Sequence, residues 1–502
     1  MVPWRPLVTV AIGFCESLIF SGLIFGWPSL VHVLQIEGVY SHLCLTGEDY
    51  GQNATSLLLG GGNNATGDDH VIIKCKDQDN MFGLLYSVML AAFGIPSVII
   101  GFSLDYLGLR YTRLFGNTMV LAGFLSLSFA TAETPWLLWP GMLCICLGAN
   151  TLRLCALQYG NAWPEKRSTI MFLYTSAHAI STTVFLMFQY ANSAGLSLQT
   201  SALAVSVICG LTFVSTFILP KMKVEEPAAP EPEYKEKIPM KSSKDNVFLE
   251  KSREAGELER SVGHLDKEEK SQSDTTVIPL MESIKTMSFV LHMIWLINVY
   301  MLRFYITSFN TWAWKTTNDA SQVAFYNSFA GTCSLISPFI SPIGGIVTDY
   351  ITKKAGQKED KVERLASKFQ APVLILCVTT TLILSVYVCK LFYSPLAVYI
   401  SIVMVSIARP VTIASVYTYV RIRFYPEHFN RLTGLGFTVI SIVCLAQYPM
   451  YVWLFHSDES YTLASTSFCI VILCTFISPG HLMLRRFPLR FAAEEIRNRK
   501  NV

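Results

Sequence analysis

The chain has few charged residues for its length. Asp, Glu, Lys and Arg make up 15% of its 502 residues, whereas hydrophobic residues make up 52%. Soluble domains usually contain about 25% charged residues, so this composition excludes an ordinary soluble protein and points to a lipid environment. The net charge is only +3, and we therefore expect no nucleic-acid partner.

Motifs for several kinds of chemistry are also missing. The sequence has no phosphate-cradling loop with a P-loop lysine, no nucleophile elbow and no clustered spacing of metal ligands. We therefore expect no enzyme activity, no cofactor and no metal site. ATP-driven pumping likewise has no support in the sequence.

Long apolar stretches dominate the chain instead. A helix needs ~20 apolar residues to cross a bilayer, and the chain supplies such stretches repeatedly between charged or Gly-, Pro- and Asn-containing breaks. We predict an all-α membrane protein whose twelve transmembrane helices form two pseudo-symmetric bundles of six. The expected spans are residues 7–34, 81–104, 114–130, 136–159, 168–190 and 200–219, then 288–312, 322–347, 369–389, 396–420, 432–455 and 463–484.

The order of the spans predicts the domains and their orientation. Residues 1–220 would form the N-terminal bundle and residues 286–484 the C-terminal bundle. Residues 221–285, rich in Lys and Glu, would be a disordered linker, and residues 485–502 a tail. Basic residues fall in alternate loops, and Lys and Arg in short loops mark the cytoplasmic side. We therefore expect both termini and the linker to be cytoplasmic.

The loop at residues 35–80 would then face outward. It contains two N-x-[ST] sequons, at Asn53 and Asn64, which would be glycosylated in an exoplasmic loop. Cys44 and Cys75 flank the sequons and could form a disulfide in an oxidising compartment.

Two short motifs recur in the two halves. The segment GFSLDYLGLRYTR, with Gly101 and Asp105, follows the second span, and GIVTDYITKK, with Gly345 and Asp349, follows the eighth. The second pair is WPEKRST at residues 163–169 and YPEHFNRLT at residues 425–433. Both pairs stand at corresponding positions, which indicates that two related six-helix units make up the chain.

The first motif resembles the loop signature of the major facilitator superfamily, except that Tyr106 stands where that family usually has a basic residue. Small Gly101 would let helices approach, and Asp105 at a helix end could pair with a cation or with a helix N-terminus. Such a contact would latch the cytoplasmic face in one state, and a purely structural loop is the alternative. The residues expected to act in gating are Gly101, Asp105, Arg110, Arg113 and Asp349.

A narrower resemblance extends along nearly the whole chain. The sequence resembles solute carrier family 43 in FGWPSL at residues 25–30 after Glu16, in the loop between Cys44 and Cys75, in RST at 167–169, in PEHF at 426–429 and in Gln447 before Pro449. The stretch LQYGN at residues 157–161, followed by Tyr174, favours the nucleobase carriers of that family.

The resemblance implies facilitative, sodium-independent uniport of purine nucleobases such as adenine, guanine and hypoxanthine across the plasma membrane by alternating access. It also implies a small-molecule substrate, a lipid bilayer as surroundings and a monomeric chain. Two alternatives stay open. One is a large neutral amino acid uniporter of the same family, and the other is a non-transporting receptor or scaffold on the same fold.

Ionisable residues inside the spans are the first candidates for substrate contacts, because a charge at a helix centre costs about 2.5–3.5 kcal/mol on insertion scales. Glu16, Arg153 and Arg409 stand out in this respect. Pro410 is expected to break the tenth span beside Arg409. Glu16 and Arg409 could pair with each other, which would lock the bundle, or could contact the substrate.

Amide and aromatic side chains at membrane depth are the second candidates. A nucleobase is flat and rich in donors and acceptors, so its site needs ring faces and amides. His178 is read as a hydrogen-bonded packing residue rather than a proton carrier. The full set of expected substrate-binding residues is Glu16, Trp27, Gln158, Tyr174, Asn310, Tyr326, Arg409 and Gln447.

Overall fold

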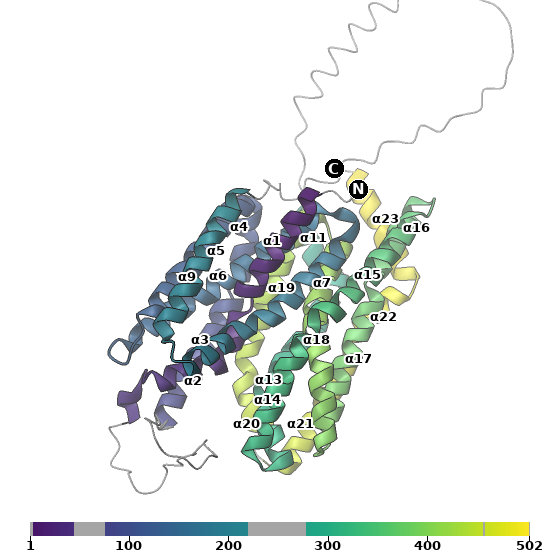
Figure 1. Ribbon diagram of the computed structural model, residues 1–502. Coiled ribbons are helices and arrows are strands. Elements are labelled where there is room, and N and C mark those ends of the chain that lie inside the picture. The colour runs from purple at the N-terminus through teal and green to yellow at the C-terminus, as the bar shows by residue number, and fades with distance from the viewer. Residues whose placement is uncertain (1–3, 45–75, 219–277, 455–456, 501–502) are drawn as a thin grey trace, which may run out of the picture.

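The computed structural model describes residues 4–44, 76–218, 278–454 and 457–500 (Figure 1). Throughout these residues the regular elements are helices, with no strand among them, which confirms the expected all-α class. The N-terminal half contains α1 (Trp4–Phe20), η1 (Leu23–Gly26), α2 (Trp27–Ile36), α3 (Lys76–Gly94), α4 (Ser97–Tyr106), α5 (Gly108–Ser128), α6 (Leu138–Leu157), α7 (Arg167–Ile180), α8 (Val184–Ser193) and α9 (Leu198–Ile218).

The C-terminal half begins with the short helix α11. Its elements are α11 (Leu280–Ile284), α12 (Met287–Trp295), α13 (Ile297–Thr317), α14 (Ala320–Ser334), α15 (Ser337–Gly356), α16 (Lys361–Gln370), α17 (Val373–Cys389), α18 (Pro395–Arg423), α19 (Phe429–Val443), α20 (Gln447–Leu454), α21 (Asp458–Cys474), α22 (Ile477–Met483) and α23 (Arg486–Lys500).

Helical residues occupy every one of the twelve predicted spans. In the described chain, ten helical segments are long and apolar enough to cross a membrane, and α14 with α15, bent by 47°, makes an eleventh. The third predicted span lies in α5, whose first part contains Arg110, Arg113 and Asn117, and α5 is not among these segments. It nevertheless packs along α6 and α9 as part of the bundle.

The first span is broken at mid-length, where it crosses the fifth span at close range. A Cβ atom placed on Gly22 would lie 2.2 Å from the carbonyl oxygen of His178, so only glycine fits at this crossing. The backbone N–H of Gly22 donates to Ser181 Oγ at 3.0 Å, which gives the broken helix a substitute hydrogen bond. The crossing of the first and fifth spans places η1 in the interior of the bundle.

The tenth span is not broken, contrary to the expectation from Pro410. Helix α18 continues from Pro395 to Arg423 with Pro410 inside it. Proline removes the hydrogen bond that the carbonyl of Ser406 would normally accept. Ser337 of α15 donates its hydroxyl to that carbonyl at 3.3 Å, which explains why the helix tolerates the proline.

The two halves meet through corresponding pairs of helices. Helix α4 packs against α19, and α15 packs against α7, so the end of the second span of each half contacts the fifth span of the other half. Both chain termini lie at the face where these pairs meet, and the ribbons of the two halves diverge toward the opposite face (Figure 1).

The predicted linker and the predicted tail each contain a described helix, α11 and α23 respectively. Most of residues 221–285 lies outside the described residues, but Ile278 accepts a hydrogen bond from His428 Nε2 at 2.9 Å, where the chain enters the second half. In the tail, α23 packs on α16. The guanidinium of Arg423 lies 4.7 Å from the ring centre of Phe369 and 4.5 Å from that of Phe491.

Candidate functional site

A cavity lies between the two halves of the bundle. It encloses about 510 Å³ of space that atoms do not fill, part of it open to solvent. Helices far apart in sequence supply its walls. The lining residues are Phe25, Phe93, Arg153, Thr175, His178, Ala179, Val299, Leu302, Arg303, Ile306, Arg409, Pro410 and Ile413.

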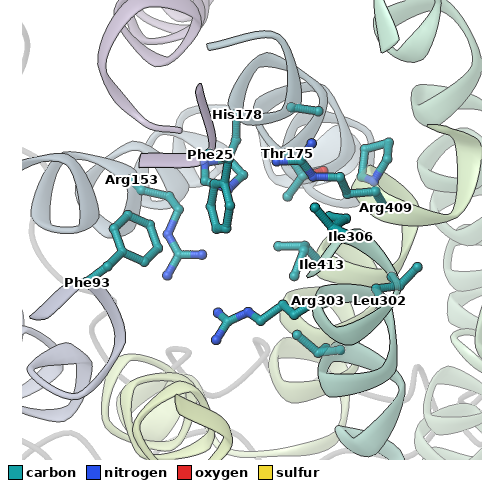
Figure 2. Close-up of a pocket in the computed structure, with 13 residues that line it drawn as sticks. Phe25, Phe93, Arg153, Thr175, His178, Leu302, Arg303, Ile306, Arg409 and Ile413 are labelled. Atoms are coloured by element: carbon teal, nitrogen blue, oxygen red, sulfur yellow. The ribbon is translucent and has the colours of Figure 1, made fainter. Parts of the chain in front are cut away.

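Arginines supply the charge of the cavity. Figure 2 shows the guanidinium groups of Arg153 and Arg303 directed into the same space. Arg153, on α6, donates to Asn150 Oδ1 at 2.6 Å and lies 5.0 Å from the ring centre of Phe93. Arg303, on α13, is only loosely held, since its two hydrogen bonds, to Ser441 Oγ and Cys444 Sγ, are both 3.4 Å long.

Arg409 of α18 approaches the cavity from the other side. Its guanidinium carbon lies 5.0 Å from the ring centre of Phe25, within the distance of a cation–π contact. Its Nη2 atom is buried and has no hydrogen-bond partner among the described residues. Arg409 therefore has donor capacity left for a bound solute.

Aromatic rings form the remaining wall. The rings of Phe25 and Phe93 meet edge to face with centres 5.8 Å apart, and the ring of His178 lies 5.6 Å from Phe25. His178 Nδ1 is within 2.9 Å of the carbonyl oxygen of Ser21, so the described contacts of this histidine are those of a packed, hydrogen-bonded residue. Ring faces and guanidinium donors together suit a flat, acceptor-rich solute.

Of the eight expected substrate-binding residues, only Arg409 lines this cavity. Glu16 pairs with Arg113 at 2.5 Å. The pair of Glu16 with Arg409 that the sequence suggested is therefore not the one that forms. Ser215 Oγ also donates to Glu16, at 2.5 Å. Sequence reasoning could not choose between these arginines because the fold, rather than the spacing, decides which helix faces α1.

Tyr174 and Gln158 are not among the residues that line the cavity. Tyr174 donates to the carbonyl oxygen of Val10 at 3.2 Å and lines a smaller void that shares Arg153 and His178 with the main cavity. Gln158 donates to Asn430 Oδ1 at 2.6 Å. Gln158 thus connects the two halves and does not line the cavity.

The other expected residues are distributed over the bundle. Trp27 stacks on Tyr86 with ring centres 6.4 Å apart, and Tyr326 packs edge to face on Tyr399. Asn310 is exposed and accepts a hydrogen bond from Asn327 at 3.0 Å. Gln447 is buried, and its Nε2 atom has no hydrogen-bond partner within the described structure. The cavity does not include these four residues.

The repeated motifs face each other across the halves. Asp105 Oδ2 accepts from Arg431 at 2.6 Å, and Asp105 Oδ1 accepts from Asn430 at 2.8 Å, both in the first turn of α19. Asp349 accepts the backbone N–H groups of Ser168 and Thr169, in the first turn of α7, at 3.0 and 2.9 Å. Each aspartate therefore lies at a helix N-terminus of the opposite half, where negative charge is favourable.

Glycines allow this close approach. A Cβ atom on Gly101 would lie 2.4 Å from the carbonyl oxygen of Asn430, and one on Gly345 would lie 2.5 Å from Thr169 Cα. Of the two arginines that were grouped with these residues, Arg110 is half-buried on α5. Arg113 is not part of the contact between the halves, because it is buried and bonds to Glu16, Tyr159, Ser215 and Thr216 inside the first half.

The predicted glycosylation sites and the disulfide cannot be placed in the fold. Asn53, Asn64 and Cys75 lie outside the described residues, and Cys44 ends a short 3-10 helix at Ser41–Cys44. Both features stay predictions.

Among the arginine and phenylalanine residues of the cavity, sequence reasoning missed Phe25, Phe93 and Arg303. Arg303 lies inside the apolar span predicted at residues 288–312, so the criterion that selected Arg153 would also have selected it. The two phenylalanines carried no comparable signal, since phenylalanine is common throughout the spans.

Comparison with known proteins agrees with the fold. The model of the Major Facilitator Superfamily matches residues 9–448. Equilibrative nucleobase transporter 1 of Bos taurus is 23% identical over 489 residues, with 95% of this chain and 96% of the relative covered. The large neutral amino acids transporter small subunit 3 of Homo sapiens is 22% identical over 497 residues, with 87% and 85% covered.

Solved structures of similar shape support the architecture alone. The proton:xylose symporter XylE has a TM-score of 0.53 at 8% identity, with 94% of this chain and 95% of that chain covered. The human organic anion transporter MFSD10 has a TM-score of 0.53 at 14% identity, with 95% and 100% covered. Because the family model matches most of its length, the chain belongs to the Major Facilitator Superfamily and is a multi-pass membrane transporter.

Proposed function

We propose that the chain is a facilitative, sodium-independent carrier of purine nucleobases in the plasma membrane and that it works by alternating access. The observation that supports this proposal is the cavity between the halves, in which arginine donors and phenylalanine rings face one space. A carrier site must lie where both halves contribute, since their relative movement exposes it to either side.

The chemistry of the cavity suits 6-oxopurines in particular. Guanine presents two neighbouring acceptors, O6 and N7, to which an arginine fork binds in a bidentate manner. Hypoxanthine shares both acceptors. Adenine instead presents a donor at its amino group, for which Thr175 and His178 are the polar neighbours in the lining. We therefore expect guanine and hypoxanthine to be better substrates than adenine.

A neutral amino acid fits the cavity less well. Its carboxylate could bind an arginine, but its ammonium needs an acceptor, preferably a carboxylate. Among the described residues that line the cavity, none is Asp or Glu. Glu16, which could have served, is already paired with Arg113. The relative named as a nucleobase transporter also covers more of this chain than the human amino acid transporter does.

The contacts of Asp105 and Asp349 supply the gate in this proposal. Both join the halves at the face of the termini, which basic loops predict to be cytoplasmic. Breaking them would let the halves separate there and expose the cavity to the inside. The proposed domains are accordingly the two bundles, joined by the linker.

Uptake of radiolabelled hypoxanthine, adenine and leucine by cells that express the chain tests this function. We expect uptake of hypoxanthine above the level of untransfected cells, weaker uptake of adenine and none of leucine. Uptake of leucine without either purine would replace the proposal by the amino acid alternative. Surface expression without uptake of any of the three would favour the receptor alternative.

A further inference from the structure

The arginines of the cavity carry charge that no described acidic residue in the lining balances. Arg153, Arg303 and Arg409 all line the cavity, and its described lining includes neither Asp nor Glu. Placing positive charge inside the membrane is unfavourable unless an opposite charge or strong acceptor is close. Three guanidinium groups in one site therefore favour a negatively charged occupant.

Another buried arginine of the same chain shows the contrast. Arg113 has 3% of its side chain exposed and is paired with Glu16 at 2.5 Å. Two of the cavity arginines instead rest on ring faces. Arg153 lies between Phe93 and Phe437, at 5.0 and 4.7 Å from the ring centres, and Arg409 lies 5.0 Å from the ring centre of Phe25. A ring face is a weak substitute for a carboxylate. The fold thus balances Arg113 internally and leaves the cavity arginines for the solute.

Arginine N–H groups without a hydrogen-bond acceptor also favour a negatively charged occupant. Arg153 Nε and Arg409 Nη2 are buried and have no hydrogen-bond partner in the described part of the chain. Arg153 itself is only 6% exposed, so solvent does not easily replace the missing acceptor. A planar anion offers two acceptor atoms to such donors and a ring face to Phe25 and Phe93.

We propose that the cavity binds and carries flat aromatic monoanions in preference to neutral rings of similar size. This inference rests on the proposed function, which supplies the binding site, and it adds the charge of the solute. Two sources share the required chemistry, namely oxopurines that have lost a proton and aromatic carboxylates. In either case the uniporter moves one negative charge per solute, so the membrane potential determines how far the solute accumulates.

The test uses the purified full-length chain in proteoliposomes whose lumen is made positive by a potassium gradient and valinomycin. The probes are two matched pairs, urate with hypoxanthine and nicotinate with nicotinamide, in which the first member is a monoanion at neutral pH and the second is neutral. We expect a carried anion to accumulate about tenfold at a potential of about 59 mV, the factor for one charge. Hypoxanthine should equilibrate without accumulation.

The four probes distinguish failure of the anion preference from failure of the proposed nucleobase carrier. Accumulation of urate identifies oxopurine anions as a source, and accumulation of nicotinate identifies aromatic carboxylates. Equilibration of hypoxanthine without entry of either anion overturns the anion preference and leaves the proposed nucleobase carrier standing. Entry of nicotinate without any purine supports the anion site and overturns the nucleobase carrier. Exclusion of all four probes overturns both.

Three variants test whether the charge of Arg303 is needed for uptake of the anion. Arg303→Gln removes it, Arg303→Lys keeps it, and Arg490→Gln makes the same change on exposed α23, where Arg490 pairs with Glu494 at 2.9 Å. We expect Arg303→Gln to lower anion uptake by about tenfold or more, since hydrogen bonds to charged groups are the strong ones. Arg303→Lys should recover most of it, and Arg490→Gln should match the unchanged chain. An unchanged size-exclusion profile and melting temperature in detergent would show that Arg303→Gln is folded, and an equal loss of uptake for the anion and the neutral ring would overturn the role of charge.

Discussion

Asp105 and Arg431 form an ion pair of 2.6 Å that joins the two halves of the bundle. Asp349 takes the corresponding place in the second half by accepting the backbone N–H of Thr169 at 2.9 Å. The two contacts are related by the internal repeat. Asp105 accepts from the side chains of Arg431 and Asn430, and Asp349 accepts from the backbone N–H groups of Ser168 and Thr169. Both exploit a helix N-terminus, which is the feature that the two halves share.

Loss of the Asp105 charge should slow transport more than it weakens binding. Asp105→Asn removes the ion pair with Arg431 and so destabilises the described arrangement relative to others. We expect normal surface expression, hypoxanthine flux lowered severalfold and binding nearly unchanged. Rapid uptake compared with equilibrium binding measures the difference.

The control for this latch is Asp360→Asn. Asp360 caps α16 within the second half and accepts from Glu363 N at 2.9 Å, and asparagine caps a helix about as well as aspartate. An Asp105→Asn variant with the flux of the control would contradict the latch.

Glu16→Gln should destabilise the N-terminal half. The change leaves Arg113 buried without its opposite charge, and breaking a buried ion pair by removing one partner costs about 3–5 kcal/mol. The hydroxyl groups of Ser215 and Thr216 still bond to Arg113 and reduce this cost. We expect a lower melting temperature in detergent.

A double variant separates charge from packing at this pair. Glu16→Gln with Arg113→Gln removes both charges, so it should be more stable than the sum of the single changes predicts. Additive losses would show that the ion pair contributes nothing.

Gln158→Leu should affect all substrates to the same extent. Gln158 bonds to Asn430 between the halves at 2.6 Å, so the change alters the equilibrium between states and not the contacts with a solute. We expect uptake of hypoxanthine and adenine to fall by a similar factor. Arg409→Gln, inside the cavity, should instead change the ratio of hypoxanthine uptake to adenine uptake. A changed ratio in Gln158→Leu would show that Gln158 contacts the substrate.

Lys390→Met should stabilise the protein. Lys390 follows the span that ends at Cys389, is 1% exposed and donates to Ser308 Oγ at 2.6 Å. Burial lowers the pKa of its ammonium from 10.5 to about 7. The unfolded chain therefore holds this proton up to about pH 10.5, whereas the folded chain releases it near pH 7.

The sign of the pH dependence at Lys390 follows from these values. Between about pH 7 and 10.5 the unfolded state binds more protons, so stability should rise with pH across this window. Each pKa unit corresponds to about 1.4 kcal/mol. The rise should be smaller in Lys390→Met, as thermal melts at several pH values would reveal. Equal slopes in both proteins would disprove the burial of a charge here.

Transport of neutral purines should be independent of ion gradients. Dissipating the sodium or proton gradient is expected to leave the initial uptake of hypoxanthine nearly unchanged, because the described cavity offers no carboxylate to carry a proton with the solute. Initial rates with and without ionophores measure this. Strong dependence on external pH would instead point to His178 or Glu16 as a proton carrier.

The sequence by itself determined the class, the spans and the internal repeat. These follow from local properties, because a helix in lipid must satisfy its own backbone and present apolar side chains over its full length. The matching motifs at Asp105 and Asp349 could be recognised for the same reason, since each is a short contiguous segment. Their meeting with α19 and α7 of the opposite half could not.

Only the tertiary structure decided which polar residues share a site. In a soluble helix the apolar face identifies the interior, but lipid is as apolar as a protein core, so the sequence of a span does not reveal which side faces its neighbours. Arg409 could therefore be assigned equally well to Glu16 or to a substrate. The crossing at Gly22 and the packing of α1 on α7 place Phe25 beside Arg409. In the same fold Glu16 pairs with Arg113. The spacing of these residues in the sequence does not predict either contact.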